Sequence, residues 1–310
     1  MKKVCYFGSG EFSKKVLEGI LNIKTDFVIN MVITKPDKEK GRGRILTPTP
    51  VKETALQHNI EVYDKNDIKS KEFIDMLKEK NFDLFIVCDY GKIIPEEVFK
   101  IPKMKTIGIH PSLLPLYRGP SPIQYALLNS EDKTGTTIFL INEQMDAGDI
   151  SLQREVKIEE NDDYYSLSEK LAKLSIELIK EFFTNYEKIT PIKQDETKAT
   201  YSKIILKEDG KIDWSKSAKL INGKVKAFIE WPKAYCFYKG RMIKILKSSY
   251  SSKDTKGYFG EVVEINNNNL GIKTGNGILY IERLLPENSR EMDAKSFVNG
   301  YRVKIGDVFE

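Results

Sequence analysis

A histidine and an aspartate in two separate loops are the residues of this chain best suited to proton transfer. His110 begins a loop that reads His-Pro-Ser-Leu-Leu-Pro, and Asp146, 36 residues later, begins the loop Asp-Ala-Gly-Asp. An imidazole changes its charge close to neutral pH, and a neighbouring carboxylate orients it and favours its protonated form. A single histidine in a loop is more often a structural hydrogen-bonding residue, so a catalytic role depends on whether the fold brings Asp146 beside His110.

The elements around these loops are expected to place them at one edge of a sheet. Residues 106–109 form an apolar run that predicts a strand, and His110 follows it. Residues 123–128 have helical spacing and residues 136–141 are typical of a strand, so the Asp146 loop follows a neighbouring strand. Ligands of open α/β sheets bind outside the carboxyl ends of the strands. We therefore expect His110 and Asp146 to converge in an active site.

The first part of the chain alternates between strand and helix patterns, which favours an α/β fold with a Rossmann-like, mostly parallel sheet. The Gly-Ser-Gly at residues 8–10 predicts a tight turn and not a dinucleotide site, because Ser13 stands where the third glycine of that fingerprint would fall. Strands are expected at residues 4–7, 28–34, 61–63, 84–88 and 106–109, with helices between them near residues 12–21, 50–58, 70–80 and 94–100.

A second, smaller domain is predicted near the end of the chain. Residues 164–186 have the spacing of a packing helix, and residues 190–207, which show little periodicity, are interpreted as a linker. Short runs divided by Gly and Asn turns favour an OB-like β-barrel. The predicted domains are residues 1–189 and 208–310. The second is expected to hold a helix at residues 218–228 and strands at residues 235–238, 241–246, 260–265, 270–274 and 278–284.

Positive charge is concentrated in the last third of the sequence. Of the net charge of +5, residues 206–310 carry 19 Lys and Arg against 13 Asp and Glu, which leaves −1 for the rest. A basic stretch of this kind is either a solvated face or a surface that contacts the phosphate backbone of a nucleic acid. Candidate RNA contacts in it are Lys216, Lys224 and Lys226.

A second basic segment interrupts the alternation of the first domain. Residues 35–44 contain five basic and two acidic residues, and glycines flank Arg42. We interpret the segment as an exposed loop, too polar to be a packed element, that is either simply solvated or contacts a phosphate-rich partner through Lys40, Arg42 and Arg44.

Composition excludes several other classes of protein. No apolar run approaches the roughly 20 residues needed to span a bilayer, and the Met-Lys-Lys start leads into a predicted strand instead of a signal peptide. The three cysteines, Cys5, Cys88 and Cys236, have no metal-ligand spacing, so we expect reduced thiols, no disulfide and no bound metal. A cytoplasmic protein without a membrane partner is predicted.

Taken together, His-Pro-Ser-Leu-Leu-Pro, the following Tyr-Arg-Gly-Pro-Ser-Pro-Ile and the later Asp-Ala-Gly-Asp resemble the folate-dependent formyltransferases, most closely the branch that acts on methionyl-tRNA. The resemblance extends to the Gly-Arg-Gly loop, the linker and the basic C-terminal domain. It implies formyl transfer from 10-formyltetrahydrofolate, with His110 and Asp146 as catalytic residues. The family has Asn where this chain has Gly108, so a catalytic donor is replaced by backbone.

The resemblance also implies binding residues and partners. The pterin of the folate would be read through main chain of the turn Cys88, Asp89, Tyr90 and Gly91, and the loop Ser112, Leu113, Leu114 and Pro115 would complete the folate site. Arg42 matches the arginine of a loop that enters the acceptor stem of initiator methionyl-tRNA. The expected partners are this tRNA and the folate, and we expect a monomer.

Two alternatives stay open from the sequence. One is a formyltransferase for a small amine such as an amino sugar nucleotide, which would share the catalytic motifs but gives the basic loop no role. The other is a non-catalytic relative that binds folate or RNA, motivated by Gly108 alone.

Overall fold

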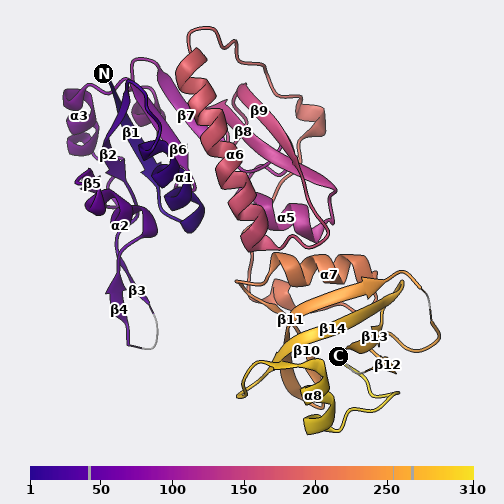
Figure 1. Cartoon of the computed structure of the whole chain (residues 1–310). Helices are drawn as coiled ribbons and strands as arrows, with labels where there is room; N and C mark the ends of the chain where they lie inside the picture. Colours follow the sequence, from indigo (N-terminus) through magenta and orange to yellow (C-terminus); the bar gives the residue numbers. More distant parts are fainter. Residues whose placement is uncertain (41–42, 254, 267–268) are drawn as a thin grey trace. The chain divides into compact units, whose positions relative to one another are not determined.

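The computed structural model of the chain describes residues 1–40, 43–253, 255–266 and 269–310, and leaves the side chain of Lys40 undescribed (Figure 1). It contains two compact units. Unit 1 comprises residues 1–122, 133–157 and 168–203, and unit 2 comprises residues 123–132, 158–167 and 204–310. The domain boundaries predicted from the sequence stay a prediction.

Unit 1 is built on a seven-stranded sheet with the strand order β5-β2-β1-β6-β7-β8-β9. The pairs from β5 to β7 are parallel, and β8 and β9 are added antiparallel. The predicted Rossmann-like, mostly parallel sheet is therefore confirmed. The strands are β1 (Lys2–Gly8), β2 (Phe27–Ile33), β5 (Glu61–Tyr63), β6 (Leu84–Cys88), β7 (Lys105–His110), β8 (Lys133–Leu140) and β9 (Ile150–Lys157).

Helices cover both faces of this sheet because successive side chains of each buried strand point to opposite faces. Cys5 and Phe7 of β1 pack with the buried residues of α3 and α4, while Tyr6 points the other way and donates a hydrogen bond from its hydroxyl to the carbonyl of Ser13 in α1. The helices of unit 1 are α1 (Glu11–Leu21), α2 (Pro50–Gln57), α3 (Lys71–Lys80), α4 (Glu96–Phe99) and most of α6 (Tyr164–Asn185), whereas α5 (Pro122–Leu128) belongs almost wholly to unit 2.

Side-chain caps fix where several helices begin. Thr49 accepts a hydrogen bond from the N–H of Lys52 at the start of α2, and Ser70 accepts one from the N–H of Phe73 at the start of α3. Each cap satisfies an N–H that the first turn of a helix leaves without a partner, which is worth about 1 kcal/mol.

The basic segment after β2 is not wholly a loop. Residues Lys38–Lys40 form β3, which pairs antiparallel with β4 (Ile45–Thr47). The prediction that the whole segment is an exposed loop was wrong for residues 38–40, which pair with β4, because main-chain pairing in a hairpin does not need apolar side chains. Gly41 and Arg42, which follow β3 in the sequence, lie outside the described residues.

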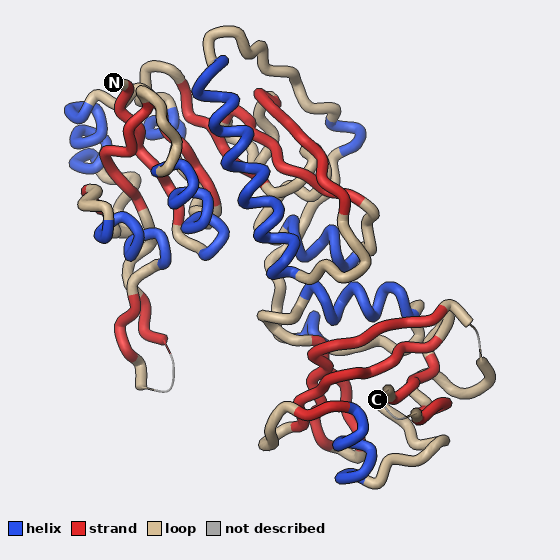
Figure 2. The backbone as a smooth tube through the Cα atoms, in the orientation of Figure 1, coloured by secondary structure: helices blue, strands red, loops and turns tan. Residues whose placement is uncertain are grey.

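The C-terminal part of unit 2 holds a mostly antiparallel sheet with the order β10-β11-β14-β13-β12, to which β15 adds beside β14 (Figure 2). Bridges from Phe309 to Tyr238 and from Val308 to Glu261 attach the C-terminal segment to the two ends of that order, which supports the predicted barrel-like closure. The elements are α7 (Ala218–Ala227), β10 (Ala234–Tyr238), β11 (Arg241–Ser251), β12 (Val262–Ile265), β13 (Leu270–Lys273), β14 (Ile278–Pro286), β15 (Met292–Asp293) and α8 (Ala294–Tyr301).

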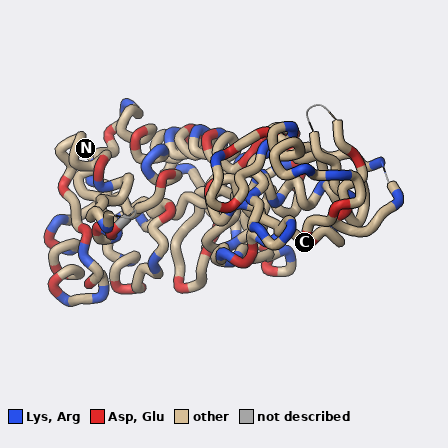
Figure 3. The backbone as a smooth tube through the Cα atoms, turned by 90° about the horizontal axis from the view of Figure 1, so that it is seen from below, with Lys and Arg blue, Asp and Glu red and all other residues tan. Residues whose placement is uncertain are grey.

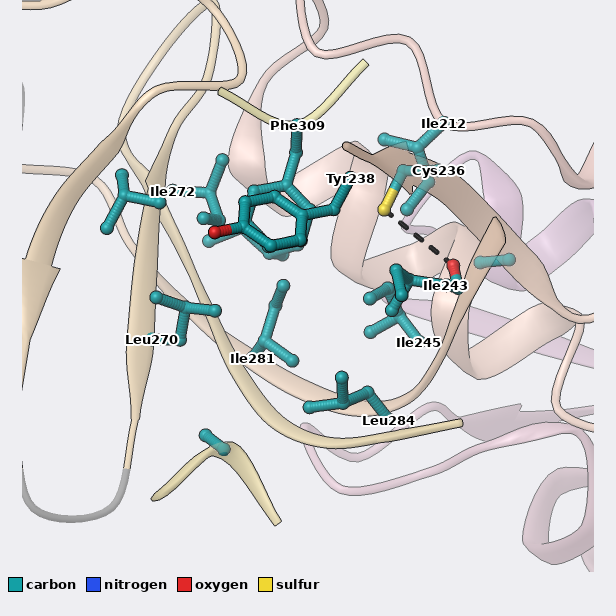
Figure 4. Close-up of a cluster of buried hydrophobic side chains, with 14 of the residues drawn as sticks. Ile212, Cys236, Tyr238, Ile243, Ile245, Leu270, Ile272, Ile281, Leu284 and Phe309 are labelled. Atoms are coloured by element: carbon teal, nitrogen blue, oxygen red, sulfur yellow. Dashed lines mark hydrogen bonds between the residues drawn. The ribbon is translucent and has the colours of Figure 1, made fainter. Parts of the chain in front are cut away.

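The inner face of this sheet is apolar. Figure 4 shows Ile243, Ile281 and Leu284 converging beneath the stacked rings of Tyr238 and Phe309, whose centroids are 4.7 Å apart. These side chains are almost completely buried, so the C-terminal part of the chain has a core of its own. Within the described residues, no helix is long and apolar enough to cross a membrane.

Candidate active site

His110 is the last residue of β7 and is buried between β6 and β8. Its Nε2 lies 2.9 Å from the carbonyl oxygen of Tyr117. A carbonyl can only accept a hydrogen bond, so Nε2 carries a proton. In the neutral ring Nδ1 therefore has the free lone pair, and it lies 3.7 Å from Oδ2 of Asp146. The two predicted catalytic side chains do converge.

The Asp146 loop is held close to the end of β8. Oδ2 of Asp146 accepts a hydrogen bond of 2.7 Å from the N–H of Gly119, and Leu140 donates its N–H to the carbonyl of Asp149. A Cβ at Gly148 would come within 1.7 Å of the carbonyl oxygen of Leu140, so only glycine fits there. The Gly of Asp-Ala-Gly-Asp thus permits the close approach that points the carboxylate at His110.

Three non-glycine residues near the pair adopt left-handed backbone conformations. The φ angles are +58° at Tyr117, +54° at Asp146 and +46° at Asp89. Such residues cost of order 1–3 kcal/mol each and persist only where surrounding contacts fix them, which happens most often at functional sites. At Tyr117 the conformation is the one in which its carbonyl meets His110.

Gly108 has no room for a side chain. It pairs with Phe139 of β8, and a Cβ on Gly108 would lie 2.4 Å from Cε1 of Phe139 and 2.9 Å from Cδ1 of Ile141. The Phe139 ring also stands edge-on to His110, with centroids 6.4 Å apart. An apolar ring therefore lies where the resemblance implies an amide donor, and this contact between β7 and β8 could not be predicted from the sequence.

The predicted folate turn follows β6. The side chains of Cys88 and Tyr90 are buried in the unit, so the outer surface of this turn is formed largely by main-chain groups. The N–H of Gly91 has no acceptor among the described residues, which leaves it available to a ligand. The turn thus offers the kind of main-chain contact that a pterin edge would use.

Asp89 adds a carboxylate to that turn. Its carboxylate accepts a hydrogen bond from the N–H of Gly10 and is close to the ammonium group of Lys35. That ammonium group lies next to Gly91. Part of Asp89 is open to solvent, yet burial by the surrounding loops raises the pKa of its carboxyl to about 6, against the opposing effects of Lys35 and Gly10. Burial likewise lowers the pKa of Lys35.

The loop of Ser112, Leu113, Leu114 and Pro115 is fixed by residues that sequence reasoning missed. Ser112 is buried and donates its hydroxyl within the loop, to the carbonyl of Leu116. Thr137 donates to the carbonyl of Ser112 and accepts from the N–H of Leu114, while Gln153 donates to the carbonyl of Leu114. Thr137 and Gln153 do not form a recognisable motif in the sequence.

The residues predicted to contact RNA differ in whether their charged groups already have partners within the protein. Arg42 and the side chain of Lys40 lie outside the described residues, and Arg44 is exposed, 3.9 Å from Glu39. Lys216 is exposed, 4.0 Å from Asp213.

The ammonium groups of Lys224 and Lys226 are engaged within unit 2. That of Lys224 donates to the carbonyls of Asp209 and Lys211, and that of Lys226 donates to the carbonyl of Glu160. Burial lowers the pKa of both lysines. Figure 3 shows Lys and Arg interspersed with Asp and Glu along the backbone of both units. Among the described residues, no group of His, Cys, Asp and Glu side chains could hold a metal ion.

Family models place this chain in a known class of enzyme. The model described as formyl transferase matches residues 2–182, and the model of the formyl transferase C-terminal domain matches residues 204–302. The family uses a formyl-tetrahydrofolate as the formyl donor.

Curated relatives give the branch. The chain is 40% identical to the methionyl-tRNA formyltransferase of Caldicellulosiruptor saccharolyticus, over 98% of this chain and 99% of that protein. It is 41% identical to the methionyl-tRNA formyltransferase of a Sulfurihydrogenibium species, over 99% and 100%. The chain therefore belongs to the formyl transferase family, and within it to the methionyl-tRNA formyltransferases.

Solved structures share the fold at lower identity. The sugar 3N-formyl transferase WlaRD superposes with a TM-score of 0.67 at 23% identity, over 94% of this chain and 99% of that chain. HypX from Aquifex aeolicus, solved with tetrahydrofolic acid, gives a TM-score of 0.61 at 20% identity, over 99% of this chain and 48% of that one.

Proposed function

We propose that the protein transfers the formyl group of 10-formyltetrahydrofolate to the amino group of initiator methionyl-tRNA, which prepares this tRNA for translation initiation. The observation that carries the proposal is the His110 and Asp146 pair, with Nδ1 facing the carboxylate at 3.7 Å, in a chain so similar over its length to methionyl-tRNA formyltransferases. We place this activity in the cytoplasm, in a single chain.

The chemistry needs a route for one proton. The amine nitrogen attacks the formyl carbon, a new C–N bond forms, and the tetrahedral intermediate collapses by breaking the bond between that carbon and N10 of the folate. The proton lost by the amine must reach N10 as that nitrogen leaves. Nδ1 of His110 takes it as general base and returns it as general acid, and Asp146 stabilises the imidazolium in between. Nε2 cannot play this part, since its proton is committed to Tyr117.

Stabilisation of the oxyanion has to come from hydrogen-bond donors other than a side chain at residue 108. Loss of one such donor in other enzymes lowers turnover by about 10²–10³. The protonated Nδ1 of His110 and main-chain N–H groups of the site would serve instead. For the folate, we propose main-chain contacts from residues 88–91 and the loop 112–115.

For the tRNA, we propose contacts from Lys40, Arg42 and Arg44 of the basic segment 35–44 and from Lys216, Lys224 and Lys226 of unit 2. Lys224 and Lys226 would have to give up hydrogen bonds to carbonyls, so the residues of the basic segment are the sharper test. Phosphate contacts release counterions, so affinity for the tRNA should fall steeply with salt. Arg42→Ala should weaken tRNA formylation while folate binding stays unchanged.

A small amine is the second candidate substrate, because the sugar formyl transferase WlaRD has the same fold. The purified protein should be assayed with 10-formyltetrahydrofolate and either initiator methionyl-tRNA or a nucleotide-linked amino sugar. Transfer to the tRNA alone supports the proposal, and transfer to the sugar alone overturns it. Transfer to neither would favour a protein that binds folate or RNA without catalysis.

A further inference from the structure

A short segment of unit 1, residues 194–202, contacts both loops that carry the catalytic pair. We call it the strap. It includes a 3-10 turn, Glu196–Lys198, and lies within the stretch that the sequence suggested was only a linker. Its contacts with the two loops depend on a buried charged side chain, which needs an explanation because burying an unpaired charge is costly.

Arg118 is the buried charge, with 1% of the residue exposed. Its Nη1 and Nη2 donate to the two carboxylate oxygens of Glu196 at 2.9 and 2.7 Å. Its Nε and Nη2 also donate to Oε1 of Gln194 at 3.1 and 2.7 Å. The planar fork of donors thus fixes two side chains of the strap at once.

Gln194 connects Arg118 to the Asp146 loop. Its Oε1 is taken by Arg118, which turns its Nε2 toward two main-chain carbonyls, that of Asp146 at 2.9 Å and that of Gly148 at 2.7 Å. Gln194 is itself buried, so it cannot replace these bonds with bonds to water. The oxygen and the nitrogen of the Gln194 amide are therefore both hydrogen-bonded. Together these bonds connect Arg118 to the loop that carries the carboxylate of Asp146.

The far end of the strap holds the other loop. The N–H of Tyr117 donates to Oγ1 of Thr200 at 2.8 Å, and the N–H of Arg118 donates to the carbonyl of Thr200. The N–H of Ser202 donates to the carbonyl of Arg118. This pairing sets the backbone from which Tyr117 accepts a bond from His110 and Gly119 donates one to Asp146.

We propose that Gln194 and Arg118 are positioning residues for the formyl transfer, and that they act by holding the carboxylate of Asp146 against Nδ1 of His110. The inference rests on the proposed function. Asp146 has an unfavourable φ of +54°, so its loop needs outside contacts to stay in place. A displacement of about 1 Å at a catalytic group can cost about 10² in rate.

Gln194→Glu separates the two halves of the amide. A carboxylate still accepts from Arg118, but it sets an oxygen against the carbonyls of Asp146 and Gly148 where a donor stood. We expect kcat to fall about 10- to 100-fold, the usual cost of losing an outer supporting contact, with KM for both substrates within about twofold. Gln194→Met adds no charge but removes both the donors and the oxygen that accepts from Arg118, so it should lower kcat at least as much and serves as the second variant if the Glu variant folds poorly.

Lys198→Ala is the matched control on the strap. Lys198 is exposed, and its ion pair among the described residues is with Asp195, at 3.0 Å, so the variant should keep the kcat of the wild type. A general loosening of the strap by any substitution would lower kcat in the control as well, and that result would overturn the inference.

A double variant asks whether Gln194 acts through Asp146. In an Asp146→Asn background, Gln194→Glu should cost less than about twofold more, because residues that act through one another are not additive. If Gln194→Glu has wild-type kcat, or if its full effect multiplies that of Asp146→Asn, the inference fails while the proposed function stands. If the wild type does not formylate methionyl-tRNA at all, the proposed function fails and the inference with it.

Discussion

The ring of Phe139 occupies the space that a side chain on Gly108 would need. The two residues face each other across β7 and β8, and Cε1 of the ring lies 2.4 Å from where a Cβ would stand. An apolar ring therefore lies where the side chain of residue 108 would begin. Restoring the donor means changing both residues.

Gly108→Asn alone should impair the protein. Overpacking in a close-packed core typically costs about 1–3 kcal/mol, and a displaced Phe139 would push on His110, so turnover should fall as well. Adding Phe139→Met should recover both, because a flexible thioether side chain can make room for the amide. Urea denaturation and steady-state formylation assays measure the two effects. A single variant that is stable and faster than the wild type would mean that Phe139 moves aside at little cost.

Replacing His110 by Ala should lower kcat by about 10²–10⁴, the range for a general acid-base residue. Asp146→Asn should also lower kcat, since an amide cannot stabilise an imidazolium. Folate binding, followed by fluorescence titration, should change little in either variant. His58→Ala is the control, because the only other histidine caps the exposed end of α2 and should not affect turnover. Near-normal turnover in His110→Ala would rule out the proton route drawn here.

Asp89→Asn should stabilise the protein at high pH. The folded pKa of this carboxyl is about 6, above the about 3.9 of an unfolded chain. The folded state therefore binds the proton more tightly, and its free energy of unfolding falls as the pH rises between these values. Because Asp89 is exposed to solvent, which screens its charge, we expect a gain of at most about 1 kcal/mol at pH 8, vanishing near pH 4.

Asp83→Asn is the matched comparison, with the opposite sign. A hydrogen bond from the N–H of Lys3 holds the pKa of Asp83 below its usual value. Its contribution to stability is present at neutral pH and is lost as the pH falls through that lowered pKa. Melting temperatures from pH 2.5 to 8 should show Asp89→Asn gaining on the wild type as the pH rises above about 4, whereas Asp83→Asn should lie below the wild type at every pH above about 4 and approach it only at lower pH. An Asp89→Asn curve that runs parallel to the wild type would contradict the assignment for Asp89.

Tyr90→Phe should raise the free energy of unfolding by about 1 kcal/mol, because a buried hydroxyl without a partner costs its desolvation. The Tyr90 hydroxyl is buried and has no hydrogen-bond partner among the described residues. Burial raises the pKa of this phenol to about 12, so the hydroxyl stays neutral. Tyr6→Phe is the control, since the equally buried Tyr6 hydroxyl donates to Ser13 at 2.8 Å and its removal should destabilise. Urea titrations that give both variants the same sign would refute this account.

Much of the sheet and the approach of His110 to Asp146 could be predicted because both depend on local patterns. Apolar runs that end in loops with Gly and Pro mark the carboxyl ends of parallel strands, and parallel strands must bring those ends to one edge. The helix α8 was missed, although Asp293 caps it and Phe297 faces the core, because Asn299 and Gly300 interrupt its pattern.

Long-range polar contacts could not be predicted. Nothing near Gln194 in the sequence indicates that its amide meets the carbonyl of Asp146, 48 residues away. Charge counts likewise suggested Lys224 as a phosphate contact, but its ammonium group is bonded to two carbonyls. Composition gives the number of charged groups in a segment but not how many of them are available to bind a partner.

Each unit is built from three separate stretches of the sequence, so the protein cannot be divided into its two units by one cut in the chain. Residues 123–132 and 158–167 belong to unit 2 although they precede the end of unit 1. Gly223 of α7 approaches the carbonyl of Leu127 so closely that a Cβ would lie 2.5 Å from it. A fragment that stops at residue 203 would keep Leu127 but lose Gly223, and a chimera joined there would bring together two surfaces that never adapted to each other. Exchange of unit 2 between related enzymes therefore requires transplanting three separate stretches of sequence.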